Sequence, residues 1–242
     1  MTYCVAMRLE AGLLFASDSR TNAGVDHIAT YRKMHVFELP GERLIVLLSA
    51  GNLATTQSVI SLLRQRLAHE VANLHNVANL YEAAVLVGNT VKEVVARDSS
   101  SATLGQGVDF GGNFIVGGQI RGESTRLFHV YPQGNFIEAG EDTPYFQIGE
   151  SKYGKPIIDR VIARDTSLHD AAKCTLISFD STIRSNLSVG LPIDMLLYPA
   201  DSFAPAEPHR IDADDPYFNK LRRGWGEGLR RVFAKLPDAE WF

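Results

Sequence analysis

The sequence predicts an α+β fold, a four-layer αββα sandwich of two antiparallel sheets with helix pairs on the outer faces. Two observations predict it. A block of strands precedes two helices, and a second block of strands precedes two more helices, a last strand and a tail. A doubly wound fold would alternate single strands with single helices. In addition, the segment 43–50 is apolar on both faces, as expected for a strand covered on both sides.

The first fifty residues have the period-two pattern of strands. Apolar side chains recur at alternate positions from Tyr3 to Leu9, and a Glu-Ala-Gly turn separates them from a second apolar run. Pro40 and Gly41 mark a further turn. The strands expected here cover residues 3–9, 13–16, 28–39 and 43–50.

The period then changes to that of helices. Apolar residues recur at intervals of three and four over residues 52–72 and 77–97, which predicts two helices. Asn52 and Asn76 stand where N-caps are expected. A short polar and glycine-rich connection, 98–112, leads to the second strand block.

The second half repeats the order of strands followed by helices. A meander of strands is followed by a further strand, two helices and a last strand, and then by a proline- and aspartate-rich surface loop at 199–216. The strands are expected at 113–120, 125–131, 135–139, 145–148 and 192–198, and the helices at 151–163 and 167–187.

The elements up to residue 198 predict one domain, 1–198, and residues 199–242 form a loop and helical extension of the same domain. In the tail, over 217–236, apolar residues share one helical face, although three glycines weaken the helix. Two alternatives stay open for this face, packing between subunits or covering the chain's own core. Its members include Phe218, Leu221, Trp225 and Leu229.

Composition excludes several classes of protein. The 242 residues carry 24 Lys+Arg against 28 Asp+Glu, a net charge of -4, which argues against a dedicated nucleic-acid binder. Two cysteines are too few for a disulfide framework. The chain contains no apolar run of about 18 residues and no basic, apolar leader at its start. The sequence therefore predicts a cytoplasmic globular protein with no membrane partner.

One segment partly matches a phosphate-binding loop. Residues 149–155 fit the pattern G-x-x-x-x-G-K between a predicted strand and a helix. Pro156 stands where the motif needs Ser or Thr for a magnesium ion, and the loose partner motif at 176–180 lies inside a predicted helix. A glycine-bounded turn is the favoured interpretation.

The seven histidines are scattered, with no H-x-H or H-x-x-x-H pair, so no metal site is predicted. A G-x-S-x-G elbow for a Ser-His-Asp hydrolase is also missing from the sequence.

Thr2 has a chemistry of its own. Because threonine is small, removal of Met1 would leave Thr2 as a free N-terminus. Its α-amine, with an ordinary pKa of about 7.7–8.0, can take the proton of its own hydroxyl, so one residue supplies nucleophile and base. A nearby cation disfavours the ammonium form of such an amine. An Asp18–Lys33 pair beside Thr2 would supply that cation and fix its orientation.

Four segments in combination resemble the β-subunits of proteasomes and the bacterial HslV peptidase, which are N-terminal nucleophile (Ntn) hydrolases. These segments are Thr2, residues 15–24 (FASDSRTNAG), Arg32-Lys33-Met34 and Leu48-Ser49-Ala50-Gly51. Further similar segments at 114–118, 127–134 and 148–151 extend the resemblance to about residue 198. The tail 199–242 and the segments TYCVAMRL and SDSRTNAGVDHI are most similar to the bacterial branch called Anbu.

The resemblance implies the same αββα sandwich and a set of catalytic roles. Thr2 is the nucleophile, and its own amine shuttles the proton. Lys33 is the cation that tunes this amine, and Asp18 orients Lys33. The N–H of Gly51 is an oxyanion donor, and Ser151 corresponds to a serine near the nucleophile's amine.

The resemblance also implies residues that bind the substrate. Asn22 lies where these enzymes hold the substrate backbone, and Ser49 and Leu53 lie where they line the specificity pocket.

One supporting motif departs from the family pattern Arg-Asp-x-x-Ser-Gly-Gly. Here Ser185 replaces the aspartate and Val189 replaces a glycine. Whether Ser185, Ser188 or Asp180 fills the supporting role stays open.

The function implied is that of a threonine endopeptidase that forms an acyl-enzyme and needs no metal or organic cofactor. Peptides or unfolded proteins are the expected substrates, in a homo-oligomer that forms a ring or an open spiral, with an unfoldase as a further candidate partner. Two alternatives remain: an Ntn hydrolase that cleaves non-peptide amides, and a catalytically silent assembly subunit like the proteasome α-subunits.

Overall fold

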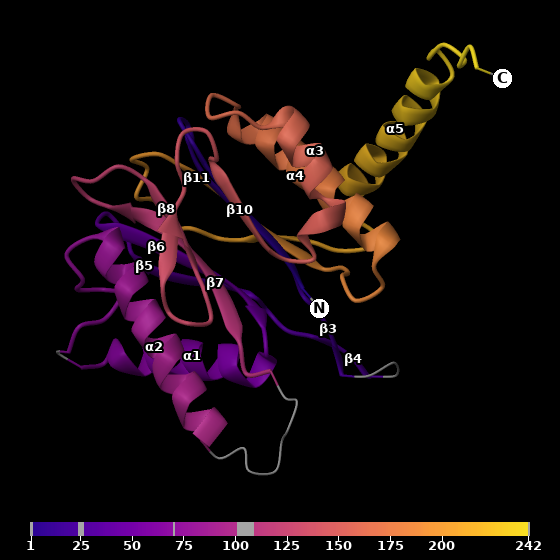
Figure 1. Cartoon of the computed structure of the whole chain (residues 1–242). Helices are drawn as coiled ribbons and strands as arrows, with labels where there is room; N and C mark the ends of the chain where they lie inside the picture. Colours follow the sequence, from indigo (N-terminus) through magenta and orange to yellow (C-terminus); the bar gives the residue numbers. More distant parts are fainter. Residues whose placement is uncertain (1, 24–26, 70, 101–108, 242) are drawn as a thin grey trace.

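Two five-stranded antiparallel sheets lie face to face at the centre of the computed structural model (Figure 1). The first sheet has the strand order β10-β1-β2-β11-β12 and the second β5-β6-β7-β8-β9. The first comprises β1 (Tyr3–Leu9), β2 (Gly12–Asp18), β10 (Tyr145–Gly149), β11 (Ile193–Pro199) and β12 (His209–Ile211). The second comprises β5 (Met34–Leu39), β6 (Arg43–Gly51), β7 (Gly112–Ile120), β8 (Arg126–Val130) and β9 (Phe136–Glu138).

The structure describes residues 2–23, 27–69, 71–100 and 109–241. Met1, whose removal the sequence predicts, and most of the predicted connection at 98–112 lie outside these ranges.

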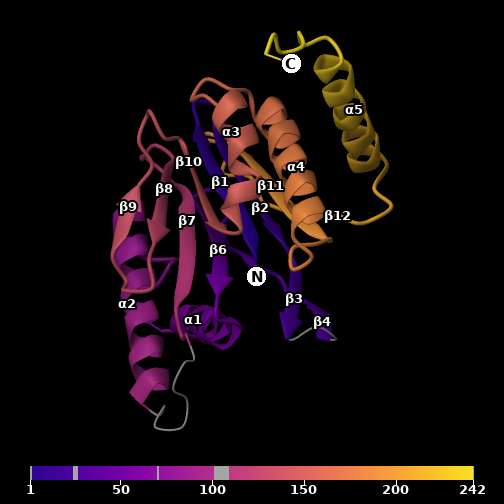
Figure 2. The same cartoon turned by 45° about the vertical axis from the view of Figure 1, so that its right-hand side comes forward.

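Helices cover the outer face of each sheet (Figure 2). Helices α1 (Leu53–Arg66) and α2 (Leu80–Ser100) pack on the second sheet. The 3-10 helix η1 (Ser151–Tyr153) and helices α3 (Lys155–Val161) and α4 (Leu168–Ser185) pack on the first. This arrangement confirms the predicted four-layer αββα sandwich.

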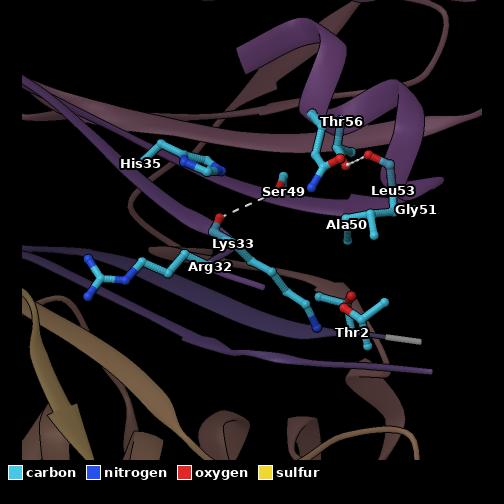
Figure 3. A pocket seen from close by; sticks show the side chains of 11 residues that line it. Thr2, Arg32, Lys33, His35, Ser49, Ala50, Gly51, Leu53 and Thr56 are labelled. Carbon is cyan, nitrogen blue, oxygen red and sulfur yellow. Dashed lines mark hydrogen bonds between the residues drawn. The ribbon is translucent and has the colours of Figure 1, made fainter. Parts of the chain in front are cut away.

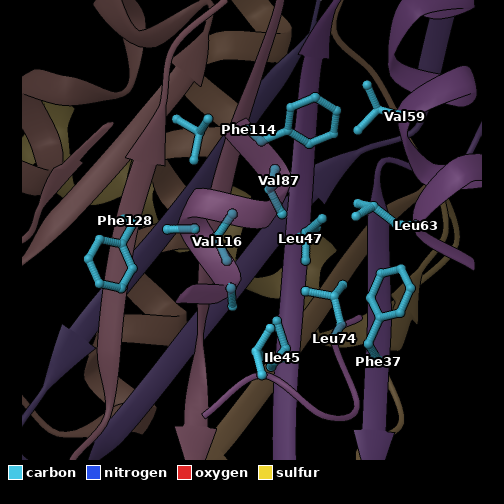
Figure 4. Close-up of a cluster of buried hydrophobic side chains, with 14 of the residues drawn as sticks. Phe37, Ile45, Leu47, Val59, Leu63, Leu74, Val87, Phe114, Val116 and Phe128 are labelled. Atoms are coloured by element: carbon cyan, nitrogen blue, oxygen red, sulfur yellow. The ribbon is translucent and has the colours of Figure 1, made fainter. Parts of the chain in front are cut away.

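Three apolar clusters fill the spaces between the layers. One joins α1 and α2 to the second sheet, where Leu47 and Val116 meet Val87 (Figure 4). Another joins the first sheet to α3 and α4, and the third lies between the sheets. Strand β1 contributes to two of these clusters. Val5 lies in the cluster between the first sheet and α4, which we call the α4 cluster, and Cys4 lies in the cluster between the sheets. Burying one large apolar side chain contributes about 1.5–3 kcal/mol to the stability of the folded state. The packed layers therefore hold the strand ends in place.

The predicted strand 28–39 is wrong, because two strands and a break occupy this segment. Strand β4 (His27–Thr30) pairs with β3 (Arg20–Ala23) in a separate two-stranded sheet, and β5 begins only at residue 34. Residues 31–33 belong to neither ladder. The break follows from competing bonds: Tyr31 N donates to Ser19 O at 2.8 Å, and the Lys33 side chain turns toward Asp18.

Of the two N-caps predicted from the sequence, the structure confirms one. Asn52 caps α1 by accepting a bond from Thr55 N at 3.2 Å, as predicted. The predicted cap at Asn76 is wrong, because its Oδ1 accepts from Asn73 N at 2.7 Å in a preceding turn. Asn79 instead accepts from Glu82 N at 2.9 Å at the start of α2.

The C-terminal region differs from the expected loop. Residues 209–211 form β12, which pairs with β11. Helix α5 (Pro216–Phe233) then runs its full length despite its glycines and extends beyond α4 (Figures 1 and 2). Asp215 caps it by accepting from Phe218 N at 2.7 Å, and the proline at its first position needs no N–H partner. Upstream, the predicted helix 151–163 is divided into η1 and α3 at Gly154.

Candidate active site

Thr2 lies immediately before β1, between the ends of two neighbouring strands. Its carbonyl oxygen accepts a bond from Glu150 N at 2.7 Å, just after β10. The next amide, Tyr3 N, donates to Asp18 Oδ1 at 3.0 Å, at the end of β2. These two bonds fix the backbone on both sides of Thr2, and the residue is largely buried, with 9% of its surface exposed.

Lys33 and Asp18 form a buried ion pair. Lys33 Nζ lies 2.6 Å from Asp18 Oδ1 and also donates to Arg20 O at 2.7 Å. The second carboxylate oxygen, Oδ2, accepts from Gly190 N at 3.3 Å. Burial raises the pKa of the Asp18 carboxyl, and the Lys33 ammonium and the N–H groups of Tyr3 and Gly190 act in the opposite direction. These contacts leave the lysine side chain with one orientation.

Gly51 ends β6 in a conformation that favours glycine. Its φ is +113°, and a Cβ added there would lie 2.4 Å from Gly111 O. The close approach holds this strand end against β7, and Asn52 N continues the contact by donating to the same oxygen at 2.9 Å. Helix α1 starts directly afterwards, so its first turn lies beside the end of β6.

A cavity of about 170 Å³ lies between Thr2, the end of β6 and the first turn of α1 (Figure 3). Five residues predicted from the sequence lie around it: Thr2, Lys33, Ser49, Gly51 and Leu53. The structure thus brings together residues that are up to 51 positions apart in the chain. Their chemical roles stay predictions.

The other predicted site residues lie outside the lining of this cavity. Asn22 is in β3 opposite Ile28, and its side chain lies outside the described part of the chain. Ser151 begins η1, next to the residue whose N–H binds the Thr2 carbonyl. Among the described residues, no hydrogen bond joins the side chain of Ser151 to Thr2.

Asp180 lies against α5. Its carboxylate accepts from Arg184 Nε at 3.1 Å and from Arg222 Nε at 2.6 Å. Within the described ranges, neither it nor Ser185 or Ser188 hydrogen-bonds to Thr2. The 184–190 segment instead contributes a backbone hydrogen bond, from Gly190 N to Asp18 Oδ2. A side-chain motif could not indicate this contact.

Sequence reasoning missed several residues that line the cavity. Thr56 and Gln57 follow Leu53 by three and four positions, so the helical spacing that places them beside Leu53 was visible in the sequence. His35 is one of the scattered histidines for which the sequence predicts no metal site. The missed lining residues are Thr21, Arg32, His35, Ala50, Thr56 and Gln57.

The partial phosphate-loop motif forms a turn. Lys155 Nζ, the group that would meet a phosphate, lies 2.7 Å from Asp159 Oδ1 and 2.8 Å from the Tyr145 hydroxyl. The partner motif at 176–180 lies inside α4 and does not form a strand. The favoured interpretation as a glycine-bounded turn therefore agrees with the structure.

Over the ranges described, no group of three or more His, Cys, Asp or Glu side chains is placed to hold a metal ion. No helix within these ranges combines the length and apolar character needed to cross a membrane.

The four-layer fold defines a class of protein, that of the αββα sandwiches of Ntn-hydrolase type. A model of the proteasome subunit family matches residues 2–195, so the chain belongs to the proteasome subunit family. No match was found among curated proteins.

Solved structures of Anbu proteins are among those similar to this chain. Anbu (ancestral beta-subunit) from Yersinia bercovieri is 63% identical, with 100% of each chain covered and a TM-score of 0.93. A helical assembly of the Anbu complex from Pseudomonas aeruginosa is 55% identical, with 99% of each chain covered and a TM-score of 0.95. An Anbu (Gly-1) mutant from Hyphomicrobium sp. strain MC1 is 53% identical over 99% of this chain and 100% of that one, with a TM-score of 0.92.

Proposed function

We propose that the chain is a threonine peptidase whose nucleophile is Thr2 after removal of Met1. One observation carries the proposal: Thr2, Lys33 and Gly51 line a single cavity, and Lys33 is fixed by a 2.6 Å contact with Asp18. Membership of the proteasome subunit family supports a hydrolase, and the proposal goes further by specifying the peptide bond.

The chemical steps use groups of this chain alone. The Thr2 amine takes the proton of Thr2 Oγ, and Oγ attacks the carbonyl carbon of the scissile peptide bond. The resulting oxyanion accepts a bond from the Gly51 N–H, a contribution of about 3 kcal/mol for a well-placed donor. The C–N bond then breaks, and the amine's proton passes to the leaving nitrogen. Water, deprotonated by the same amine, cleaves the ester and restores Oγ–H.

Lys33 and Asp18 set the state of the Thr2 amine. A cation near the amine disfavours the ammonium form, so a larger share of the enzyme has a free base at neutral pH. Asp18 holds that cation and also accepts from Tyr3 N, next to the nucleophile. Ser151, one residue beyond the Glu150 contact with Thr2, is proposed to support the amine.

Ser49 and Leu53 are proposed to line the pocket for the side chain that precedes the cleaved bond, and Asn22 to hold the substrate backbone. Peptides or unfolded proteins are the proposed substrates. The cytoplasmic location and an unfoldase partner stay predictions.

A homo-oligomer is proposed as the working state, in a ring or an open spiral. The similar Pseudomonas aeruginosa protein forms a helical assembly. Helix α5 supports the proposal for this chain, since it extends beyond α4 and exposes Leu229, Val232 and Phe233.

Intact-mass measurement with an electrophilic probe directed at N-terminal threonine tests the proposal. The untreated mass should show loss of Met1, and probe treatment should add one label per chain. Thr2→Ala should abolish labelling and peptide turnover, while Thr21→Ala, a threonine in the same cavity, should still be labelled. Labelling that persists in Thr2→Ala would refute the nucleophile. Turnover of simple amides without turnover of any peptide would favour the non-peptide amidohydrolase, and no reaction of either kind would favour the silent assembly subunit.

A further inference from the structure

The ionisable side chains that line the cavity are all bases: Arg32, Lys33 and His35. Lys33 already has Asp18 as its counter-ion. Arg32 is exposed at the cavity and forms no ion pair with any carboxylate in the described part of the chain. The lining therefore carries an uncompensated positive charge and no carboxylate of its own.

His35 belongs to the same lining, and its surroundings determine its charge. His35 and Arg32 also border a second depression of about 340 Å³, which Arg64 of α1 and Glu38 of β5 line as well. Glu38 is engaged there, since its Oε2 accepts from Ala206 N at 2.9 Å. Burial, with Arg64 adding to it, lowers the pKa of His35 to about 4. At neutral pH the imidazole is thus uncharged and carries one N–H that can serve as a donor.

The remaining polar groups of the cavity are small or neutral. Figure 3 shows the His35 ring directed toward Ser49, with Thr2 across the pocket. The Ser49 hydroxyl makes only a long bond, 3.5 Å, to Lys33 O, so its proton is available to a better acceptor. The Gln57 amide lies on the α1 side of the lining. A side chain that enters from Thr2 therefore meets hydrogen-bond donors.

We propose that this pocket selects an acidic residue, Glu or Asp, immediately before the scissile bond, with Arg32 as the pairing cation and His35 and Ser49 as hydrogen-bond donors. The inference rests on the proposed function, because it assigns the cavity to the side chain next to the reacting carbonyl. A carboxylate in this pocket gains charge-assisted hydrogen bonds that an amide of the same shape lacks. A lysine side chain would instead bring a second cation beside Arg32.

The test compares two peptides that differ only in Glu or Gln before the cleaved bond. For the full-length, Met1-processed protein we expect kcat/KM to favour Glu by about tenfold at pH 7. The preference should fall with added salt, because Arg32 is exposed to solvent. Arg32→Gln should reduce the Glu/Gln ratio to about one. The ratio is taken within each variant, so a general change in activity cancels. Arg160→Gln, an exposed arginine on α3, is the matched control and should keep the parent ratio.

A binding measurement separates this inference from the proposed chemistry. In Thr2→Ala, a tripeptide ending in Glu should bind with a Kd about tenfold lower than one ending in Gln. Both peptides carry the same terminal carboxylate, so the comparison isolates the side chain. A Glu/Gln ratio near one in the parent protein, in turnover and in binding, would overturn acidic selection while leaving the peptidase intact. Selective binding of the Glu peptide without any turnover would overturn the peptidase chemistry and support the pocket's preference. Binding of neither peptide would overturn the assignment of the cavity.

Discussion

Gly149 stands directly against the carbonyl oxygen of Thr2, and a Cβ added to it would lie 1.9 Å from that oxygen. The residue has a φ of +84°, and the following amide, Glu150 N, donates to the same oxygen at 2.7 Å. The end of β10 thus fixes the backbone of the proposed nucleophile through a close approach that only glycine permits.

Gly149→Ala should therefore destabilise the protein and displace Thr2. Gly122→Ala is a matched control, because Gly122 has a φ of +91° but no atom within 4 Å of an added Cβ. We expect a loss of about 1 kcal/mol in unfolding free energy for the control, from backbone strain alone. The Gly149 variant should lose at least about 1 kcal/mol more. Urea denaturation measures both, and equal losses in the two variants would contradict the role of the contact.

The buried pair of Lys33 and Asp18 predicts a non-additive result. Lys33→Met leaves the Asp18 carboxyl uncompensated and should lower the unfolding free energy by about 3 kcal/mol. The double variant Lys33→Met with Asp18→Asn should be more stable than Lys33→Met alone, since it buries no unpaired charge. Both should lose peptide turnover.

The same pair also predicts that the stability cost of Lys33→Met depends on pH. Without Lys33, the pKa of Asp18 rises further above its unfolded value, because the largest opposing charge is gone. The folded state then binds more protons than the unfolded state, so stability falls as pH rises. The cost of Lys33→Met should be larger at pH 8 than at pH 5 in urea denaturation. A cost independent of pH would show that the carboxyl is not the source.

Much of the fold and half of the site followed from the sequence, for identifiable reasons. Strand β6 was predictable because both its faces are apolar, and Asn52 because a cap is a local interaction. The β3–β4 hairpin was missed because residues 28–39 read as one extended run. Its interruption depends on the distant Asp18, which draws in the Lys33 side chain.

Two contacts of the site that the sequence does not predict also depend on long-range pairing. His35 lines the cavity only because β5 pairs with β6 in the observed register, which places it opposite Leu47. The Gly190 N–H reaches Asp18 across 172 positions of sequence. Neither contact leaves a local pattern, whereas Leu53, Thr56 and Gln57 share a helical spacing and could be grouped in advance.

His35 predicts a loss of stability on acidification. Its pKa is lowered to about 4 in the folded state, so between that value and about 6.5 the unfolded state binds a proton that the folded state does not. Unfolding free energy should therefore fall as pH drops through this window, and His35 should account for about 1–2 kcal/mol between pH 7 and pH 5. His35→Gln should show a correspondingly shallower pH dependence in urea denaturation. Identical slopes for variant and parent would contradict the assignment.

A buried ring and an ion pair help attach α5 to the domain, where Leu221 packs against the same apolar cluster. Phe218 is fully buried in the α4 cluster, and Arg222 Nε lies 2.6 Å from Asp180 Oδ1. Phe218→Ala should cost about 3–5 kcal/mol and increase amide exchange throughout α5. Arg222→Gln should cost less, about 1 kcal/mol, because Arg184 still pairs with Asp180. Hydrogen exchange resolved along the chain measures both effects, and unchanged exchange in α5 for Phe218→Ala would contradict the anchoring role.

The far end of α5 predicts the effect of mutation on assembly. Leu229, Val232 and Phe233 are 51%, 60% and 77% exposed, an apolar surface on a helix that contacts its own domain mainly near its start. Burial of such a surface against a second copy would supply association energy in proportion to the apolar area removed from water. Replacing all three by Gln should shift the protein toward the single chain at a given concentration in sedimentation velocity. Helical content should be preserved, because Gln is a good helix former.

Arg223→Gln, an exposed change on the same helix that leaves the apolar residues in place, should leave the sedimentation profile as in the parent. The two variants together separate the apolar surface from the charge of α5. If the triple variant assembles as the parent does, the exposed end of α5 does not hold copies together. The contact between copies then lies elsewhere, and the apolar residues of this helix end need another partner.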